Sequence, residues 1–100
     1  MKIDGNTIKF KSNLHFYNLE RKGIKPNTVR ILEEEEGLEI DKWQKKGFID
    51  GNVYRYIEIS FLPENRFFIR TLTWVGKIGV FLGKEIWMFC WKPGQINMKG

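Results

Sequence analysis

The chain has 100 residues, of which 42% are hydrophobic and 15% aromatic, and its 17 Lys and Arg against 12 Asp and Glu give a net charge of +5. This length fits one domain, and the apolar content excludes an intrinsically disordered chain. One cysteine excludes an internal disulfide, and no apolar run approaches the ~20 residues of a membrane helix, so we expect a cytoplasmic protein without membrane contact.

The first half of the chain predicts strands and helices in alternation. Residues 3–10 alternate in polarity around turn residues and predict a strand or the start of a hairpin. Residues 12–22 predict a helix, for which Gly23 supplies a left-handed C-cap. Residues 28–32 are rich in β-branched side chains and predict a strand, and residues 33–46 predict a second helix.

The second half of the chain predicts mostly strands. Residues 53–61 and 66–73 predict two strands of a hairpin, and the glycines within residues 76–79 predict a turn. Residues 85–91 are too apolar for an exposed edge and predict a central strand. We expect residues 93–100 to form a flexible tail.

The order of these elements predicts an α+β fold, in which strands outnumber helices. A small curled mixed sheet or a PUA-like β-barrel with one or two flanking helices fits that order better than a parallel βαβ fold. Residues 1–92 form the single predicted domain.

The segment from Gly23 to Arg30 concentrates side chains suited to ligand binding. Gly23 allows a chain reversal, and Pro26 stiffens the loop that follows. Thr28 and Arg30 lie two residues apart on a predicted strand and therefore point to one face, which Lys25 can reach from the loop. These donors would converge on an anion or a polar heterocycle.

The spacing Gly23-x-Lys25-x-x-Thr28-x-Arg30 resembles the signature of the ASCH domain family in the PUA-like superfamily. The match covers these eight positions, and the helix before them and the strand after them agree with it. The resemblance implies a module that binds RNA, a nucleotide or a nucleoside in a cleft beside the barrel. An aromatic side chain beside cations, such as Trp74 near Arg70, can stack on a base, although core packing is the commoner role. We therefore expect ligand contacts from Gly23, Lys25, Asn27, Thr28, Arg30 and Trp74.

The same resemblance implies an alternative, a small amidohydrolase that acts on an acylated nucleoside. In that branch of the family Lys25 would be the base and Thr28 the nucleophile, with a later glutamate as partner. The sequence has no acidic residue at the matching place, and Glu58 and Glu85 are the nearest candidates. The absence of an acidic residue at the matching place favours binding over hydrolysis.

A third interpretation is a small phage or mobile-element protein that blocks a host factor by binding it. The acidic run Glu33–Glu36 permits this as a phosphate mimic, but a solvated helix start is the simpler interpretation. One His and one Cys, His15 and Cys90, do not make a common zinc site, and no cofactor motif is present. We expect neither a metal nor a cofactor.

Overall fold

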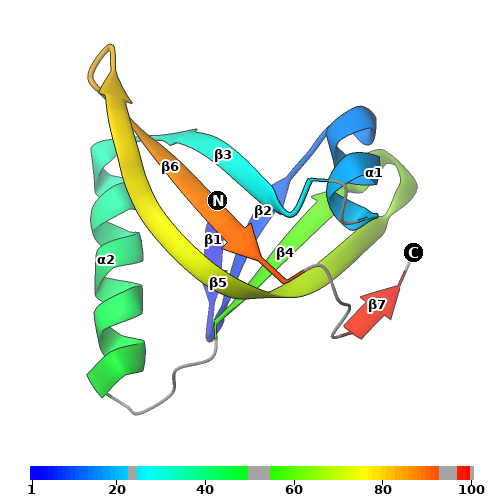
Figure 1. Ribbon diagram of the computed structural model, residues 1–100, viewed down its shortest axis with the longest axis horizontal. Helices are drawn as coiled ribbons and strands as arrows, with labels where there is room; N and C mark the ends of the chain where they lie inside the picture. The colour runs from blue at the N-terminus through cyan, green and yellow to red at the C-terminus, as the bar shows by residue number, and fades with distance from the viewer. Residues whose placement is uncertain (23–24, 50–54, 93–96, 100) are drawn as a thin grey trace.

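The computed structural model describes residues 1–22, 25–49, 55–92 and 97–99 of the chain (Figure 1). The elements follow the order β1 (Lys2–Asp4), β2 (Thr7–Lys11), α1 (Leu14–Arg21), β3 (Asn27–Leu32), α2 (Glu34–Ile49), β4 (Tyr56–Phe61), a 3-10 turn (Leu62–Glu64), β5 (Arg66–Phe81), β6 (Lys84–Trp91) and β7 (Asn97–Lys99). The chain therefore belongs to the predicted α+β class.

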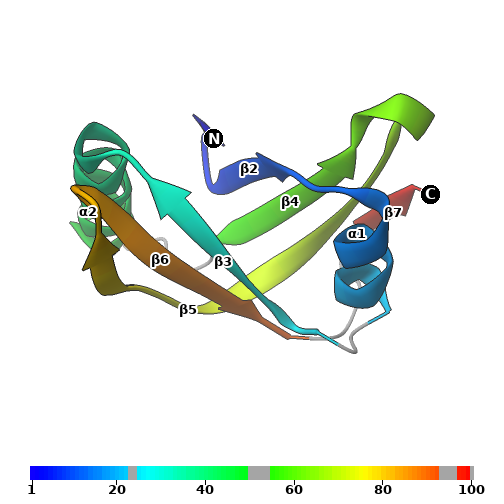
Figure 2. The ribbon, with the colours of Figure 1, turned by 90° about the horizontal axis from the view of Figure 1, so that it is seen from above.

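The strands form one mixed sheet in the order β1-β2-β4-β5-β6-β3, with β7 paired to β5. Among the described strands, β2 and β4 are the one parallel pair, and the other pairs are antiparallel. The sheet curls so that β3 faces β2 across an open gap (Figure 2), but it does not close into a barrel. The predicted curled mixed sheet is confirmed, and a closed barrel is not.

The long strand β5 produces the curl and corrects one sequence prediction. It spans 16 residues, pairs with β4 through its first half and with β6 through its second. Gly76 and Gly79 lie inside this strand and do not form the predicted turn; the register with β6 shifts between Lys77 and Gly79. A bulge bends a strand and increases its twist, and glycines are common at such bends. The turn comes later, at Leu82 and Gly83, which have positive φ angles of 50° and 77°.

The other predicted elements lie close to their expected places. The helix expected over residues 12–22 is α1, and the one expected over 33–46 is α2, which continues to Ile49. The central strand expected over 85–91 is β6, between β5 and β3. In the segment expected to be a tail, residues 97–99 pair with β5 as β7, and residues 93–96 lie outside the described part.

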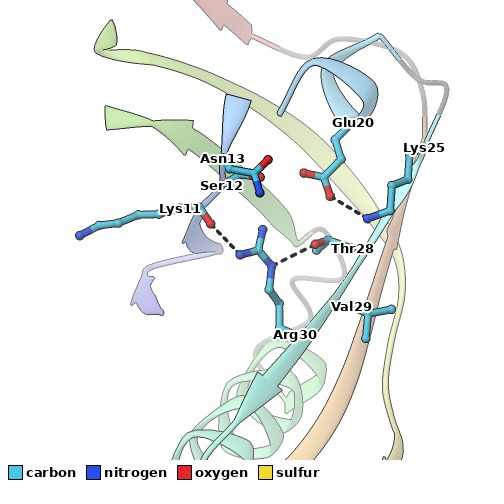
Figure 3. Close-up of a pocket in the computed structure, with 8 residues that line it drawn as sticks. All are labelled: Lys11, Ser12, Asn13, Glu20, Lys25, Thr28, Val29 and Arg30. Atoms are coloured by element: carbon cyan, nitrogen blue, oxygen red, sulfur yellow. Dashed lines mark hydrogen bonds and ion pairs between the residues drawn. The ribbon is translucent and has the colours of Figure 1, made fainter. Parts of the chain in front are cut away.

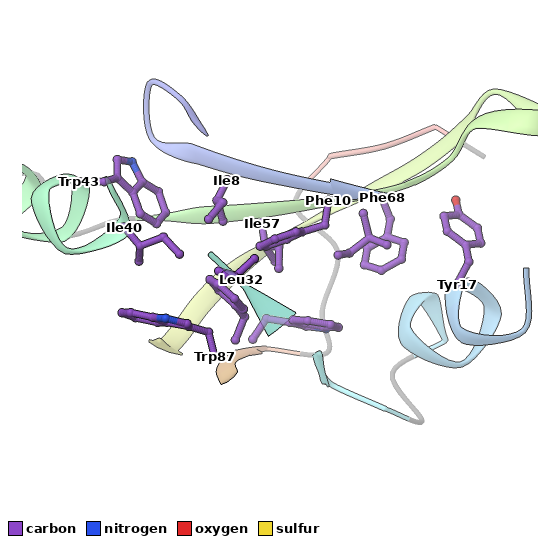
Figure 4. Close-up of a cluster of buried hydrophobic side chains, with 12 residues drawn as sticks. Ile8, Phe10, Tyr17, Leu32, Ile40, Trp43, Ile57, Phe68 and Trp87 are labelled. Carbon is purple, nitrogen blue, oxygen red and sulfur yellow. The ribbon is translucent and has the colours of Figure 1, made fainter. Parts of the chain in front are cut away.

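The hydrophobic core fills the inside of the curled sheet (Figure 4). Strands from both halves contribute to it, and the rings of Phe10 on β2 and Phe89 on β6 meet edge to face at 4.9 Å. Helix α2 adds Ile40 and Trp43, and α1 adds Tyr17. Burying one such side chain contributes about 1.5–3 kcal/mol. The core therefore holds the part of the sheet that contains β2 and β4 against the part that contains β6 and β3, on either side of the gap.

Within the described part of the chain, neither helix has the length and apolar character needed to cross a bilayer.

Candidate functional site

A cavity of about 410 Å³ opens where the end of β2 faces β3, in the gap that the sheet leaves open (Figure 3). We call it the seam pocket. Strand β1 pairs only with residues 7–9 of β2, so the last residues of β2 have no β1 partner on that side. The pocket is lined by Lys11, Ser12, Asn13, Glu20, Lys25, Thr28, Val29 and Arg30.

Thr28 and Arg30 project into this pocket from the same face of β3, as the sequence predicts. The Arg30 Nε–H donates a hydrogen bond to Thr28 Oγ1 over 3.0 Å, and Arg30 Nη1 donates to the backbone carbonyl of Lys11 over 2.6 Å. The guanidinium also lies 4.9 Å from the centre of the Phe10 ring. Arg30 thus spans the gap between β3 and β2 and forms one wall of the pocket.

The environment of Arg30 is a partly buried one. Removal of water lowers the pKa of its guanidinium from the ordinary value, and the negative charge of Glu20 partly opposes that change. Because arginine starts from so high a pKa, it keeps its charge at neutral pH. A ligand in the pocket therefore meets a fixed planar cation with reduced hydration.

Glu20 is the site residue that the sequence analysis missed. It lies in the last turn of α1, its side chain is 1% exposed, and its Oε2 is 3.4 Å from Lys25 Nζ. Its other oxygen, Oε1, is buried and has no hydrogen-bond partner among the residues that the structure describes. The Lys25 backbone N–H donates to the Leu19 carbonyl over 3.1 Å, which brings the loop back onto the helix and joins the two charges.

A signal for Glu20 was present in the sequence. It follows Tyr17 by three residues, and residues at that spacing share one face of a helix. Tyr17 is fully buried in the core. A carboxylate on the buried face of a helix is costly unless it is paired, so this position marks a candidate functional residue.

The remaining predicted contacts lie elsewhere or outside the described residues. Gly23 belongs to the undescribed residues 23–24, and Asn27 begins β3 without lining the pocket. Trp74 lines a smaller cavity with Trp43 on another part of the sheet, so the structure does not bring it to Lys25.

The two glutamates considered as partners also lie away from the pocket. Glu58 lines a separate cavity with Lys9 on the other side of β2. Glu85 accepts a hydrogen bond from Trp87 Nε1 over 2.9 Å and pairs with Lys77 at 3.7 Å. The carboxylate that lies beside Lys25 in the seam pocket is that of Glu20.

The charged groups of the seam pocket are mixed. Lys25 and Arg30 supply two cations, Glu20 supplies one carboxylate, and the Lys11 ammonium points away from the other lining side chains in Figure 3. Among the described residues, no cluster of three His, Cys, Asp or Glu side chains is placed to hold a metal ion. The pocket suits a ligand that carries both hydrogen-bond donors and acceptors.

Comparisons with protein-family models, with curated proteins and with solved structures give no match to this chain. The ASCH resemblance therefore stays a prediction that rests on the motif from Gly23 to Arg30.

Proposed function

We propose that this chain is an ASCH-like module that binds a nucleotide or RNA, and that the seam pocket takes one nucleoside unit. The observation that carries the proposal is the convergence of Lys25, Thr28 and Arg30 on one cavity with Glu20 beside them. Residues of the motif contribute three of these four side chains, so the resemblance and the pocket point to the same place.

The size and lining of the pocket support a small heterocyclic ligand. A volume of about 410 Å³ lies within the ordinary range for small-molecule sites. Free phosphate offers only acceptors when fully ionised, and the Glu20 carboxylate would repel it. A nucleobase offers N–H donors beside acceptors, which complement Glu20 on one side and Lys25 and Arg30 on the other. We therefore place a base in the pocket and any phosphate outside it.

Calorimetric titration with a nucleoside, its monophosphate and a short single-stranded RNA tests this proposal. We expect Arg30→Gln and Lys25→Ala each to weaken binding by about tenfold, as the loss of a charge-assisted hydrogen bond implies. RNA affinity should fall as salt rises, whereas nucleoside affinity should change little.

Lys84→Ala is the matched control, because it removes a half-exposed lysine paired with Glu33 at the far end of β6. Equal affinity of wild type, Arg30→Gln and Lys25→Ala for every ligand that binds would refute the site. Weakening of all three variants alike, Lys84→Ala included, would indicate nonspecific attraction to a basic protein.

Amide hydrolysis is a second candidate, favoured by one observation, the Glu20 carboxylate 3.4 Å from Lys25 Nζ. Thr28 Oγ1 would attack the acyl carbonyl of an N-acylated nucleoside. Lys25 would pass one proton to Glu20, take the hydroxyl proton of Thr28 in its place, and then protonate the leaving amine. Water would then hydrolyse the threonyl ester. Glu20 would hold Lys25 in place and stabilise its charged form after proton transfer.

Chromatographic assay of N-acylated nucleosides separates hydrolysis from binding. Thr28→Val keeps the shape of the side chain and removes the hydroxyl, so it should abolish turnover while the chain stays folded. Glu20→Gln should lower turnover with a smaller effect on binding, and Glu58→Gln should leave turnover unchanged. Undiminished turnover in Thr28→Val would rule out Thr28 as the nucleophile.

A further inference from the structure

The side of the β5-β6-β3 half that faces away from the core is apolar and exposed. Cross-strand partners share a face, so the register places Val29 beside Met88 and Gly76, and Ile31 beside Ile86 and Gly79. Val29, Ile31 and Trp74 are 45%, 62% and 50% exposed. We define the outer face as Asn27, Val29, Ile31, Trp74, Gly76, Gly79, Ile86, Met88 and Cys90, none of which carries a charge.

Neither helix covers this face. In Figure 2 neither α1 nor α2 crosses it, because both helices lie at the ends of the curled sheet. Gly76 and Gly79 add no side chain, and the Trp74 ring lies over Gly76, where a Cβ would come within 2.5 Å of the ring. An exposed apolar patch of a few hundred Å² is within the ordinary range for the largest patch on a monomer, and such patches are often functional.

The charges at the two ends of the outer face are opposite. At the end where β3 leads into α2, the exposed carboxylates of Glu34 and Glu35 follow one another, next to the Glu33–Lys84 pair. At the other end, exposed Lys22 precedes β3 and exposed Lys92 follows β6. The face is thus an uncharged strip between an acidic end and a basic end.

From these observations we infer that the outer face binds the outer face of a second copy of this chain in an antiparallel, two-fold arrangement. A two-fold axis that crosses the strip at right angles to its length stacks apolar surface on apolar surface and sets each acidic end against the basic end of the other copy. A parallel arrangement would set like charges together. Charge complementarity therefore selects this partner and this orientation.

The area of the strip limits the affinity expected for the dimer. Three strands about 4.8 Å apart and about 20 Å long give roughly 300 Å² per copy, well below the ~800 Å² of a standard interface. The charged ends must therefore contribute to the binding free energy. We expect a dimer that forms reversibly and depends on the protein concentration.

Sedimentation equilibrium of the full chain over a range of concentrations tests this inference. We expect a monomer–dimer equilibrium whose dissociation constant rises at least tenfold in Ile31→Glu, which places a charge in the strip. Leu62→Glu is the matched control, because Leu62 is 55% exposed in the 3-10 turn, away from this face. Circular dichroism should show both variants folded.

A charge exchange tests the orientation. Lys92→Glu should weaken the dimer, and the addition of Glu35→Lys in the same chain should restore it, because each interface then has its opposite charges again. A chain that stays monomeric at every concentration, or a dimer that Ile31→Glu weakens no more than Leu62→Glu, would overturn the inference. Equal dimer strength in the single and double charge variants would overturn the antiparallel orientation.

Discussion

Arg30 Nη1 donates a 2.6 Å hydrogen bond to the backbone carbonyl of Lys11, and this contact connects two strands that share no backbone ladder. The sheet leaves the gap between β2 and β3 open, and one side chain spans it. Arg30 therefore both lines the pocket and joins β3 to β2.

Arg30→Ala should lower the free energy of unfolding by about 1.5–3 kcal/mol, because it removes hydrogen bonds made by a charged group to Lys11 and Thr28. Urea denaturation measures this change. Lys84→Ala, which breaks a solvent-exposed pair with Glu33, should lower the free energy of unfolding far less than Arg30→Ala does. Equal losses in the two variants would show that Arg30 does not hold the gap.

The part of the site that lies on one strand was predictable from the sequence. Thr28 and Arg30 share a face because side chains alternate along a strand, and the structure places both in the seam pocket. Lys25 precedes Thr28 by three residues, so its approach to the same face was also predictable from the local sequence. The general class of the fold followed in the same way from the order of strands and helices.

The parts of the site that the sequence did not predict depend on contacts between residues distant in the sequence. The spacing from Tyr17 predicts that Glu20 faces the core, but its contact with Lys25 depends on how α1 packs on the sheet. Trp74 was expected at the ligand because it lies near the end of the strand predicted over residues 66–73, but β5 runs on as one bent strand and carries Trp74 to the outer face. The curl of β5 is a property of the whole sheet.

Gly37→Ala should destabilise the protein, although alanine is the better helix former by about 1 kcal/mol. Gly37 is buried in α2, and a Cβ there would overlap Glu85 Oε1 and lie 3.2 Å from Trp87 Nε1. The carboxylate would have to leave its 2.9 Å hydrogen bond with Trp87. We expect a net loss of about 1 kcal/mol in urea denaturation.

A double-mutant cycle checks the cause of that loss. In a Glu85→Ala background the obstructing carboxylate is gone, so Gly37→Ala should become neutral or stabilising. The same loss in both backgrounds would place the conflict elsewhere.

Arg70→Ala should loosen the end of α1. The Arg70 side chain is fully buried, and its Nη2 donates a 2.7 Å hydrogen bond to the carbonyl of Arg21, the residue after Glu20. Burial lowers the pKa of this guanidinium, yet it keeps its charge at neutral pH, so the cation faces the negative end of the helix dipole. Its removal leaves both a cavity and an unpaired carbonyl, with an expected loss of about 2–4 kcal/mol.

Hydrogen exchange of the backbone amides separates this local effect from general destabilisation. In Arg70→Ala the amides of α1 should exchange faster relative to those of β4 than they do in Arg30→Ala. Uniform acceleration across α1 and β4 in both variants would contradict a specific role of Arg70 at the helix end.

Gly76→Ala should displace the Trp74 ring and leave the core intact. A Cβ at position 76 would lie 2.5 Å from Cζ2 and Cη2 of Trp74, closer than the two groups can approach, and the half-exposed ring is free to swing toward solvent. Tryptophan fluorescence should therefore shift to longer wavelength while the urea midpoint changes little. In a Trp74→Phe background the remaining tryptophans should show no such shift, and a shift that persists there would mean that Gly76 contacts a different ring.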